Sequence, residues 1–165
     1  MQNKVTVHPF PPLYDENSKI LILGSFPSIK SREQMFFYGH PQNRFWKVVS
    51  TVFDDKIPCS IEEKKEFLRL HGIALWDVIA SCEIDGSSDS SIKNVKVNNI
   101  SEILNTVDIK AIFVNGKTAE KYYKKCMEKT VCRSAICLPS TSPANAAWSI
   151  DRLIKAWSVI KEQVV

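Results

Sequence analysis

Four short runs of continuous apolar, strand-forming residues constrain the fold of this chain more than any other feature. They span residues 20–23, 73–76, 111–114 and 135–138. Each run is too continuous in apolar residues to leave one face in water, which is typical of strands in a parallel sheet covered on both sides. Between the runs, apolar residues recur at helical spacing within residues 45–52, 100–107 and 150–157. This alternation predicts an α/β protein with a buried, mostly parallel sheet.

The composition is that of an ordinary globular domain, and we expect one domain over residues 1–165, of which 44% are hydrophobic. No apolar run approaches the roughly 20 residues that span a bilayer. The N-terminal residues also lack the apolar stretch and cleavage site of a signal peptide. We therefore expect a soluble, cytoplasmic protein with no membrane partner, and a monomer by default. Residues 8–14 contain three prolines and predict an extended arm, whereas the serine-rich residues 82–91 predict a loop.

Cysteine usage and charge narrow the class of protein further. Five cysteines in a chain without an export signal predict reduced thiols. The chain has no Cys-x-x-Cys pair and no histidine beside its cysteines, so we predict neither a metal site nor a cofactor. The formal net charge of +4 is compatible with a polyanionic partner but does not identify one.

Polar residues and glycines follow each of the predicted strands. The first strand is followed by Gly24, Ser25 and Phe26, and the second by Asp77. The third and fourth strands are followed by residues 115–118 and 139–145. Ligands of open parallel sheets bind at the carboxyl ends of the strands. We therefore expect these four segments to converge on one functional edge.

Residues 115–118 read Asn-Gly-Lys-Thr, like the end of a phosphate-binding P-loop. A P-loop needs another glycine five positions before Gly116, where Ala111 stands, so a strand-to-helix turn is the better interpretation. Lysines follow at positions 117, 121, 124, 125 and 129. This stripe could contact phosphates. A solvated helix face, with Glu120 and Lys124 as an i,i+4 pair, is the favoured interpretation.

The densest cluster of functional groups is residues 38–47, which read Tyr-Gly-His-Pro-Gln-Asn-Arg-Phe-Trp-Lys. On its own, this block is equally compatible with Asn43 capping a helix while Phe45 and Trp46 fill the core. Together with residues 24–28 and the Ser-Thr-Ser-Pro-Ala segment at 140–144, it resembles the uracil-DNA glycosylase superfamily. The block preceded by Tyr38 and Gly39 is most similar to the hypoxanthine-DNA (deoxyinosine) glycosylase family. The resemblance covers nearly the whole chain and implies a three-layer α/β/α sandwich around a central four-stranded parallel sheet.

The resemblance also implies which residue positions the attacking water. Uracil-excising relatives carry Asp or Asn as the third residue of the first motif, where this chain has Phe26, which cannot orient water. Similarity to the hypoxanthine branch moves the catalytic role to Asn43, whose amide orients water without having the basicity to deprotonate it. Many relatives fill the vacated base stack with a leucine. Here Ala144 occupies that position, so no residue is assigned this role.

Asp77 aligns with the position at which the superfamily usually has an asparagine that reads the base edge. A carboxylate is an acceptor and suits the N1–H donor of hypoxanthine. The alternative is that Asp77 caps the turn that follows it. The implied base-binding residues are Gly24, Ser25, Phe26, Tyr38 and Asp77, and the implied DNA-binding residues are His40, Arg44, Ser140, Thr141 and Ser142. His40 is equally compatible with a structural turn, and the three hydroxyls with caps of the last helix.

The implied activity is hydrolysis of the N-glycosidic bond of a deaminated base, most simply hypoxanthine, after the nucleotide rotates out of the duplex. No lysine is assigned as a nucleophile, which predicts a monofunctional enzyme that leaves an abasic site. The predicted partner is DNA containing a deaminated base. Three alternatives stay open: a uracil or mismatch-specific glycosylase, against which Phe26 argues, a non-catalytic nucleic-acid-binding module, and a nucleotide-binding protein, which lacks the glycines of a phosphate cradle.

Overall fold

A central parallel sheet of four strands organises the computed structural model, which describes residues 4–164. Its strand order is β3-β2-β6-β7, formed by Ile73–Asp77, Ile20–Gly24, Ala111–Asn115 and Ile136–Leu138. Ile20 pairs with both Ile73 and Ala111, so the three long strands start at one level. The sequence prediction of these strands is confirmed to within one residue at each end.

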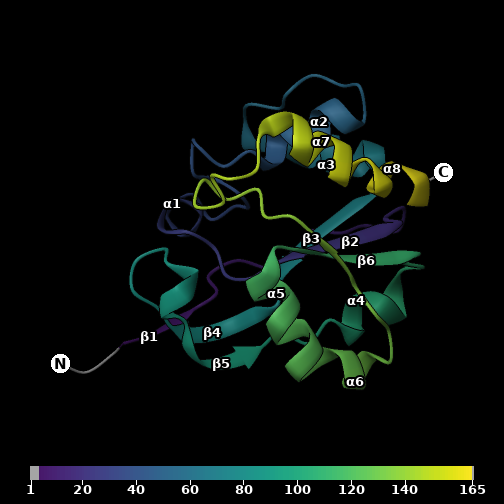
Figure 1. Ribbon diagram of the computed structural model, residues 1–165. Helices are drawn as coiled ribbons and strands as arrows, with labels where there is room; N and C mark the ends of the chain where they lie inside the picture. Colours follow the sequence, from purple (N-terminus) through teal and green to yellow (C-terminus); the bar gives the residue numbers. More distant parts are fainter. Residues whose placement is uncertain (1–3, 165) are drawn as a thin grey trace.

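Helices cover both faces of this sheet (Figure 1). One face packs against α2 (Phe45–Val52), α3 (Ile61–His71), α7 (Ile150–Trp157) and α8 (Val159–Gln163). The other face packs against α4 (Ser101–Thr106), α5 (Lys117–Tyr122) and the π-helix Tyr123–Met127, which runs into α6 (Glu128–Val131). Alternate strand residues divide between the two cores: Ile20 and Ile22 enter the first, Leu21 and Leu23 the second. The expected three-layer α/β/α sandwich is therefore confirmed.

A second, antiparallel sheet extends the molecule beyond the predicted layers. It consists of β1 (Val5–Val7), β4 (Ile79–Glu83) and β5 (Lys93–Val97) in the order β1-β4-β5. Because Cys82 and Glu83 complete β4, the prediction of a loop from residue 82 was wrong at its start. The remaining loop contains the 3-10 turn Asp89–Ser91. Short half-buried strands of this kind lack the continuous apolar signal that marked the central sheet.

The proline-rich arm is extended as predicted, and it places His8 beside the central sheet. The His8 amide donates to the Ala80 carbonyl at 2.8 Å, and Leu13 bridges to Leu75 in antiparallel fashion. Beyond Gly24, the chain continues into the short helix α1 (Ile29–Gln34) before it reaches residues 38–47. Both connections therefore deliver side chains to the carboxyl edge of the sheet.

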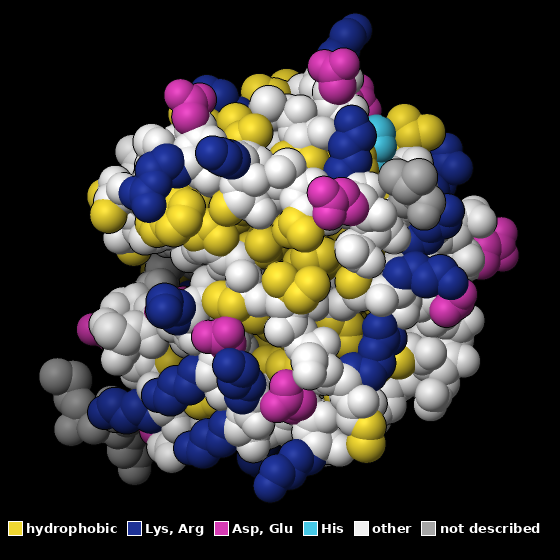
Figure 2. Space-filling view, turned by 45° about the vertical axis from the view of Figure 1, so that its right-hand side comes forward, with side chains coloured by type: hydrophobic (Ala, Val, Ile, Leu, Met, Phe, Trp, Pro, Cys, Tyr) yellow, Lys and Arg dark blue, Asp and Glu magenta, His cyan; other side chains and the backbone are white. Residues whose placement is uncertain are grey.

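Asn99 Oδ1 accepts a hydrogen bond from the amide of Ser101, the first residue of α4. The favoured interpretation of the lysine stripe holds, because Lys124 pairs with Glu120 at 3.5 Å. On the face seen in Figure 2, Lys and Arg side chains are dispersed among acidic ones rather than gathered in one band. None of the helices in the described part of the chain is long and apolar enough to cross a membrane.

Candidate active site

The carboxyl ends of β2 and β3 meet directly. Gly24 and Asp77, the last residues of the two strands, are register partners, and the Val78 amide donates to the Gly24 carbonyl at 2.8 Å. On the other side of β2, Asn115 ends β6 opposite Leu138 of β7. The expected convergence of the strand ends is therefore confirmed for all four strands.

A buried histidine–carboxylate pair lies at this edge. His8 Nε2 is 2.7 Å from Asp77 Oδ2, and the two side chains are only 4% and 6% exposed. His8 Nδ1 accepts a long hydrogen bond from the Phe10 amide, so Nε2 carries the proton and donates it to Asp77. Among the hydrogen bonds of residues 4–164, none is made to Asp77 Oδ1. The pair thus leaves one carboxylate oxygen available as an acceptor.

Sequence reasoning missed His8 as a site residue. It precedes Asp77 by 69 residues and belongs to an arm that the prolines marked only as extended. Asp77 itself is not the cap of the following turn, because its carboxylate contacts His8 while its backbone carbonyl accepts from Asn98. The capping alternative for Asp77 is therefore wrong.

Gly24 is required for space rather than for backbone freedom. A Cβ at this position would overlap Asp77 Oδ1 and would lie 3.1 Å from the hydroxyl of Tyr38. The glycine therefore lets the carboxylate and the phenol approach the end of β2.

Tyr38 brings a buried hydroxyl to the same place. Its backbone is left-handed, with φ at 52°, and its ring stacks on Phe45 at 4.0 Å between centroids. The hydroxyl has no hydrogen-bond partner among the described residues. Burial raises the pKa of Tyr38, the negative charge of Asp77 adds to the rise, and the Asn115 side chain opposes it. The phenol is consequently neutral at physiological pH, and its O–H is available to donate a hydrogen bond.

Ser25 and Phe26 follow the end of β2. Ser25 Oγ lies 3.0–3.1 Å from both carboxylate oxygens of Asp89, which arrives from the 3-10 turn. Burial raises the pKa of Asp89, and the hydrogen bonds from Ser25 and Thr118 oppose this shift. Phe26 is buried, meets His8 edge-on at 6.0 Å, and has the Arg32 guanidinium over its ring at 5.6 Å. Asp89 is a further carboxylate at this site, and sequence reasoning did not predict it.

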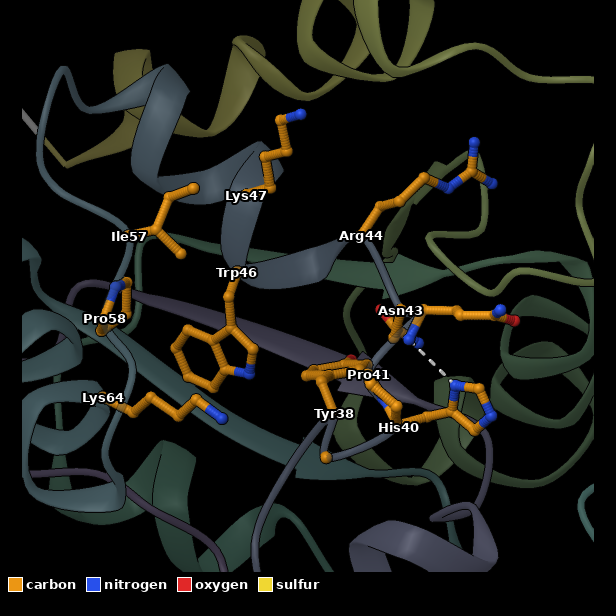
Figure 3. A pocket seen from close by; sticks show the side chains of 12 residues that line it. Tyr38, His40, Pro41, Asn43, Arg44, Trp46, Lys47, Ile57, Pro58 and Lys64 are labelled. Atoms are coloured by element: carbon orange, nitrogen blue, oxygen red, sulfur yellow. Dashed lines mark hydrogen bonds between the residues drawn. The ribbon is translucent and has the colours of Figure 1, made fainter.

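A groove of about 310 Å³ runs along residues 38–47 (Figure 3). Asn43 lines it, and Asn43 Oδ1 accepts from the Phe45 amide at 2.9 Å in the turn that leads into α2, whose N-cap residue is Arg44. An amide oxygen has a second lone pair, so this bond leaves Asn43 able to hold a water. His40 Nδ1 accepts from the Gln42 amide at 3.1 Å, which stabilises the turn and leaves Nε2 unused by it.

The structure gives Arg44 a different set of partners from the predicted DNA phosphates. Its guanidinium donates to the carbonyls of Ser142 and Asn145, each at 3.0 Å, and to that of Trp148. Figure 3 shows the side chain extending away from Trp46. We therefore interpret Arg44 as a positioning residue that holds the loop after β7 against α2.

The hydroxyls of residues 140–142 form hydrogen bonds within the protein. Thr141 is fully buried and its Oγ1 accepts from Asn115 Nδ2 at 3.0 Å, so its side chain is turned away from any surface ligand. Ser140 and Ser142 each accept a hydrogen bond from an amide two residues ahead. The last helices are capped elsewhere: Ser149 accepts from the Arg152 amide at the start of α7. The helix-cap alternative for these hydroxyls is therefore wrong.

In the described part of the chain, no group of three or more His, Cys, Asp or Glu side chains is placed to hold a metal ion. The residues at the strand ends instead supply a carboxylate, a neutral phenol and amides. These groups read hydrogen-bond donors and acceptors and stabilise charge without a cofactor.

Comparison with known proteins identifies the family. The sequence model of the uracil DNA glycosylase superfamily matches residues 11–161. The chain belongs to this superfamily. It is 35% identical over 145 residues to a hypoxanthine DNA glycosylase of Methanosarcina acetivorans, covering 87% of this chain and 90% of the relative. A hypoxanthine DNA glycosylase of Methanosarcina barkeri is 35% identical over 115 residues, which are 68% of this chain and 73% of the relative.

A solved structure also supports membership of this superfamily. The solution NMR structure of a candidate uracil DNA glycosylase from Methanosarcina acetivorans superimposes with a TM-score of 0.80 at 32% identity. The match covers 94% of this chain and 96% of the other. The resemblance stated from residues 24–28, 38–47 and 140–144 is thereby confirmed for the family and the fold.

Proposed function

We propose that this protein hydrolyses the N-glycosidic bond of hypoxanthine in DNA and leaves an abasic site. The names of the two Methanosarcina relatives support the choice of base. The single observation that carries the proposal is the buried Asp77 carboxylate, held at the sheet edge by His8 with one oxygen unpaired among the described residues. This arrangement presents an acceptor where a flipped base would be read.

An acceptor at this position distinguishes hypoxanthine from adenine, its parent base. Hypoxanthine carries a hydrogen on N1 and donates it to Asp77 Oδ1, whereas adenine has a lone pair on N1. A lone pair facing a carboxylate leaves the buried acceptor unpaired, which costs about 1–3 kcal/mol in addition to the repulsion between the two acceptors. The geometry therefore favours the deaminated base over the normal one.

The departing base takes negative charge, and an isolated carboxylate would oppose its departure. His8 reduces this opposition because its Nε2–H donates to Asp77 and draws charge from the oxygen that faces away from the base. The neutral Tyr38 hydroxyl supplies a donor beside Asp77 with no partner of its own among the described residues. A donor already in place stabilises a developing anion more effectively than one that must reorient.

Asn43 holds the attacking water at the side of the groove, and none of the described residues that line the groove carries a carboxylate. An amide orients the water but does not take a full proton, so most of the rate enhancement comes from stabilising the leaving base. None of the residues assigned above to the base or to the water is a lysine. We therefore propose simple hydrolysis without an enzyme–sugar imine, and no strand cleavage by the protein itself.

The test is base excision from end-labelled duplexes that carry one deoxyinosine, deoxyuridine or deoxyxanthosine. Wild-type protein is expected to yield a strand break at deoxyinosine only after alkali. Asn43→Ala should lower the single-turnover rate by about 100-fold. Asn43→Ser, which keeps a side-chain acceptor for the Phe45 amide, is the matched control: it should retain this hydrogen bond without recovering the rate.

Each other outcome selects an alternative. Excision of uracil alone would move the protein to the uracil or mismatch-specific type. Cleavage without alkali would refute the monofunctional reaction. No excision of any base, with DNA affinity retained in Asn43→Ala, would leave a non-catalytic nucleic-acid-binding module.

A further inference from the structure

A second carboxylate stands at the carboxyl edge of the sheet, and the reaction proposed above gives it no role. Asp89 comes from the loop between β4 and β5, which lies beside α1 (Figure 1). The Ile29 amide at the start of α1 donates to Ser87 Oγ at 2.9 Å. Arg32 of the same helix donates to the Gly86 carbonyl at 2.7 Å. Packing of the loop on α1 therefore sets the position of this carboxylate.

Asp89 and Asp77 border the same edge. Ser25, whose hydroxyl contacts Asp89, directly follows Gly24, and Gly24 is the register partner of Asp77. The Ser25 carbonyl accepts from the Ile79 amide at 3.1 Å, so Ser25 extends β2 alongside the residues that follow Asp77. Burial raises the pKa of Asp89, and the negative charge of Asp77 adds to the rise, as it does for two carboxylates that lie close together. The two carboxylates reach this edge from different elements.

The contacts of Asp89 are those of an ionised group. Both of its oxygens accept from the one Ser25 hydroxyl, at 3.0 and 3.1 Å. A carboxylate accepts at either oxygen, whereas a carboxylic acid carries a proton on one of them. The hydrogen bonds from Ser25 and Thr118 also oppose the rise that burial causes in the pKa of Asp89. Within residues 4–164, no Lys, Arg or His side chain forms an ion pair with Asp89.

The charged and titratable groups of the neighbouring elements do not cancel this charge. Arg32 lies over an aromatic ring and donates to a loop carbonyl, and Lys117 at the start of α5 is exposed. His8 pairs with the other carboxylate. Burial raises the pKa of the Cys82 thiol, which Arg32 lowers and Asp89 raises further, so this thiol is neutral. Asp89 consequently adds a negative charge to the edge at which the base is read.

Hydrogen bonding to Asp77 does not separate hypoxanthine from xanthine. Both bases carry a hydrogen on N1, so both can donate to Asp77 Oδ1. They differ in charge, because the second carbonyl of xanthine acidifies its ring. Xanthine in DNA is therefore largely anionic at neutral pH, whereas hypoxanthine is neutral. A fixed negative charge repels the anion and has little effect on the neutral base.

We propose that Asp89 selects against xanthine by its charge and is a specificity-determining residue of the candidate active site. The inference rests on the proposed function, because it takes a deaminated base in DNA as the ligand at the strand ends. Asp89 does not need to touch the base, since the energy between two charges falls only as the inverse of their distance. Solvent reaches Asp89 despite the groups packed around it, which moderates the repulsion.

The experiment compares affinities for duplexes that each carry one 2′-fluoroarabino nucleotide, whose glycosidic bond resists hydrolysis. The bases are hypoxanthine, xanthine and uracil, at about pH 7.5 and about 0.1 M salt. Asp89→Asn keeps an oxygen that accepts from Ser25 and removes the charge, so affinity for xanthine relative to hypoxanthine should rise about fivefold. Uracil has carbonyls on both sides of its N–H, as xanthine does, but it is neutral. Its affinity relative to hypoxanthine should therefore not change.

Two further variants separate charge from packing. Asp85→Asn removes the same charge from an exposed position on the same loop and should leave the ratio of xanthine to hypoxanthine affinity at the wild-type value. Ser25→Ala removes the hydroxyl that contacts Asp89 but keeps the carboxylate. A loss of affinity in Ser25→Ala should consequently fall on all three bases alike.

The pH dependence gives an independent readout. As pH falls from about 7.5 to about 5.5, xanthine gains a proton, so the wild-type affinity ratio of xanthine to hypoxanthine should rise, and it should rise less in Asp89→Asn. His8 and Asp77 are present in both proteins, so their titration cancels in this comparison.

Three results would overturn the role of Asp89. They are an unchanged xanthine ratio in Asp89→Asn, an equal change in Asp85→Asn, and an equal change in the uracil ratio. If wild-type protein excises no base, the proposed function fails, whereas the affinity ratios of the uncleaved duplexes still decide whether Asp89 selects by charge.

Discussion

Replacing Gly24 with alanine tests the geometry of the candidate active site at its most crowded point. The new Cβ would overlap Asp77 Oδ1, so the carboxylate must retreat by about 1 Å to reach ordinary contact distance. A displacement of this size would take the carboxylate out of the geometry of its 2.7 Å hydrogen bond to His8. A misplacement of this size at a reacting centre costs about 100-fold in rate. That factor corresponds to about 2.7 kcal/mol of barrier.

The assay is single-turnover excision from a deoxyinosine duplex, alongside urea unfolding. Gly24→Ala should also lose about 1.5–3 kcal/mol of unfolding free energy, the range for a hydrogen bond to a charged group. Gly72→Ala is the control: Gly72 ends α3 with φ at 70°, at the opposite edge of the sheet from Asp77. It should lose about 1 kcal/mol of stability and keep its excision rate. The reasoning is refuted if Gly24→Ala excises within about threefold of wild type, or if both variants lose activity in proportion to stability.

Three further variants test single groups. Tyr38→Phe removes a buried hydroxyl that has no hydrogen-bond partner among the described residues. The unfolding free energy should therefore stay constant or rise by about 1 kcal/mol, while excision of hypoxanthine slows. A clear loss of stability would show that the hydroxyl is paired. Burial raises the pKa of Asp89, so the folded state binds the proton of this carboxyl more tightly than the unfolded chain does. The wild-type protein should therefore lose stability relative to Asp89→Asn as pH rises above about 4. A difference in urea unfolding that does not change with pH would refute this. Arg44→Gln should lower the unfolding free energy by about 2 kcal/mol, because the guanidinium bonds to loop carbonyls. The slope of log DNA affinity against log salt concentration should not change. A slope lower by about 1 would instead support the predicted contact between Arg44 and a DNA phosphate.

The central sheet and its flanking helices were predictable because their signals are local. A strand buried on both faces must be apolar at nearly every position, and a helix on that sheet must be apolar at every third or fourth position. The second sheet escaped prediction because β4 and β5 are only partly buried. The third strand, β1, pairs with β4 from a distant part of the chain, and such a pairing leaves no periodic trace in a single sequence.

The residues of the candidate site also divide into those that the sequence predicted and those that it did not. Gly24, Asp77 and Asn43 follow strands or begin a helix, so their positions at the sheet edge followed from the order of elements. The roles of Arg44 and Thr141 did not, because a guanidinium or a hydroxyl can turn either to solvent or to the protein. In the folded chain, the Arg44 guanidinium donates to loop carbonyls, and the Thr141 hydroxyl accepts from the Asn115 amide. Buried polar groups must be paired, and only the packed structure shows which groups are buried.

By itself, the sequence determined the layers of this protein, the edge at which its chemistry is placed, and its family, because apolar periodicity and a dense ten-residue block are properties of neighbouring residues. Only the tertiary structure decided that His8 pairs with Asp77, that the Tyr38 hydroxyl has no partner among the described residues, and that Ser25 bonds to Asp89. These features join residues from distant parts of the chain. Their energies depend on distance and burial, which exist only once the chain has folded.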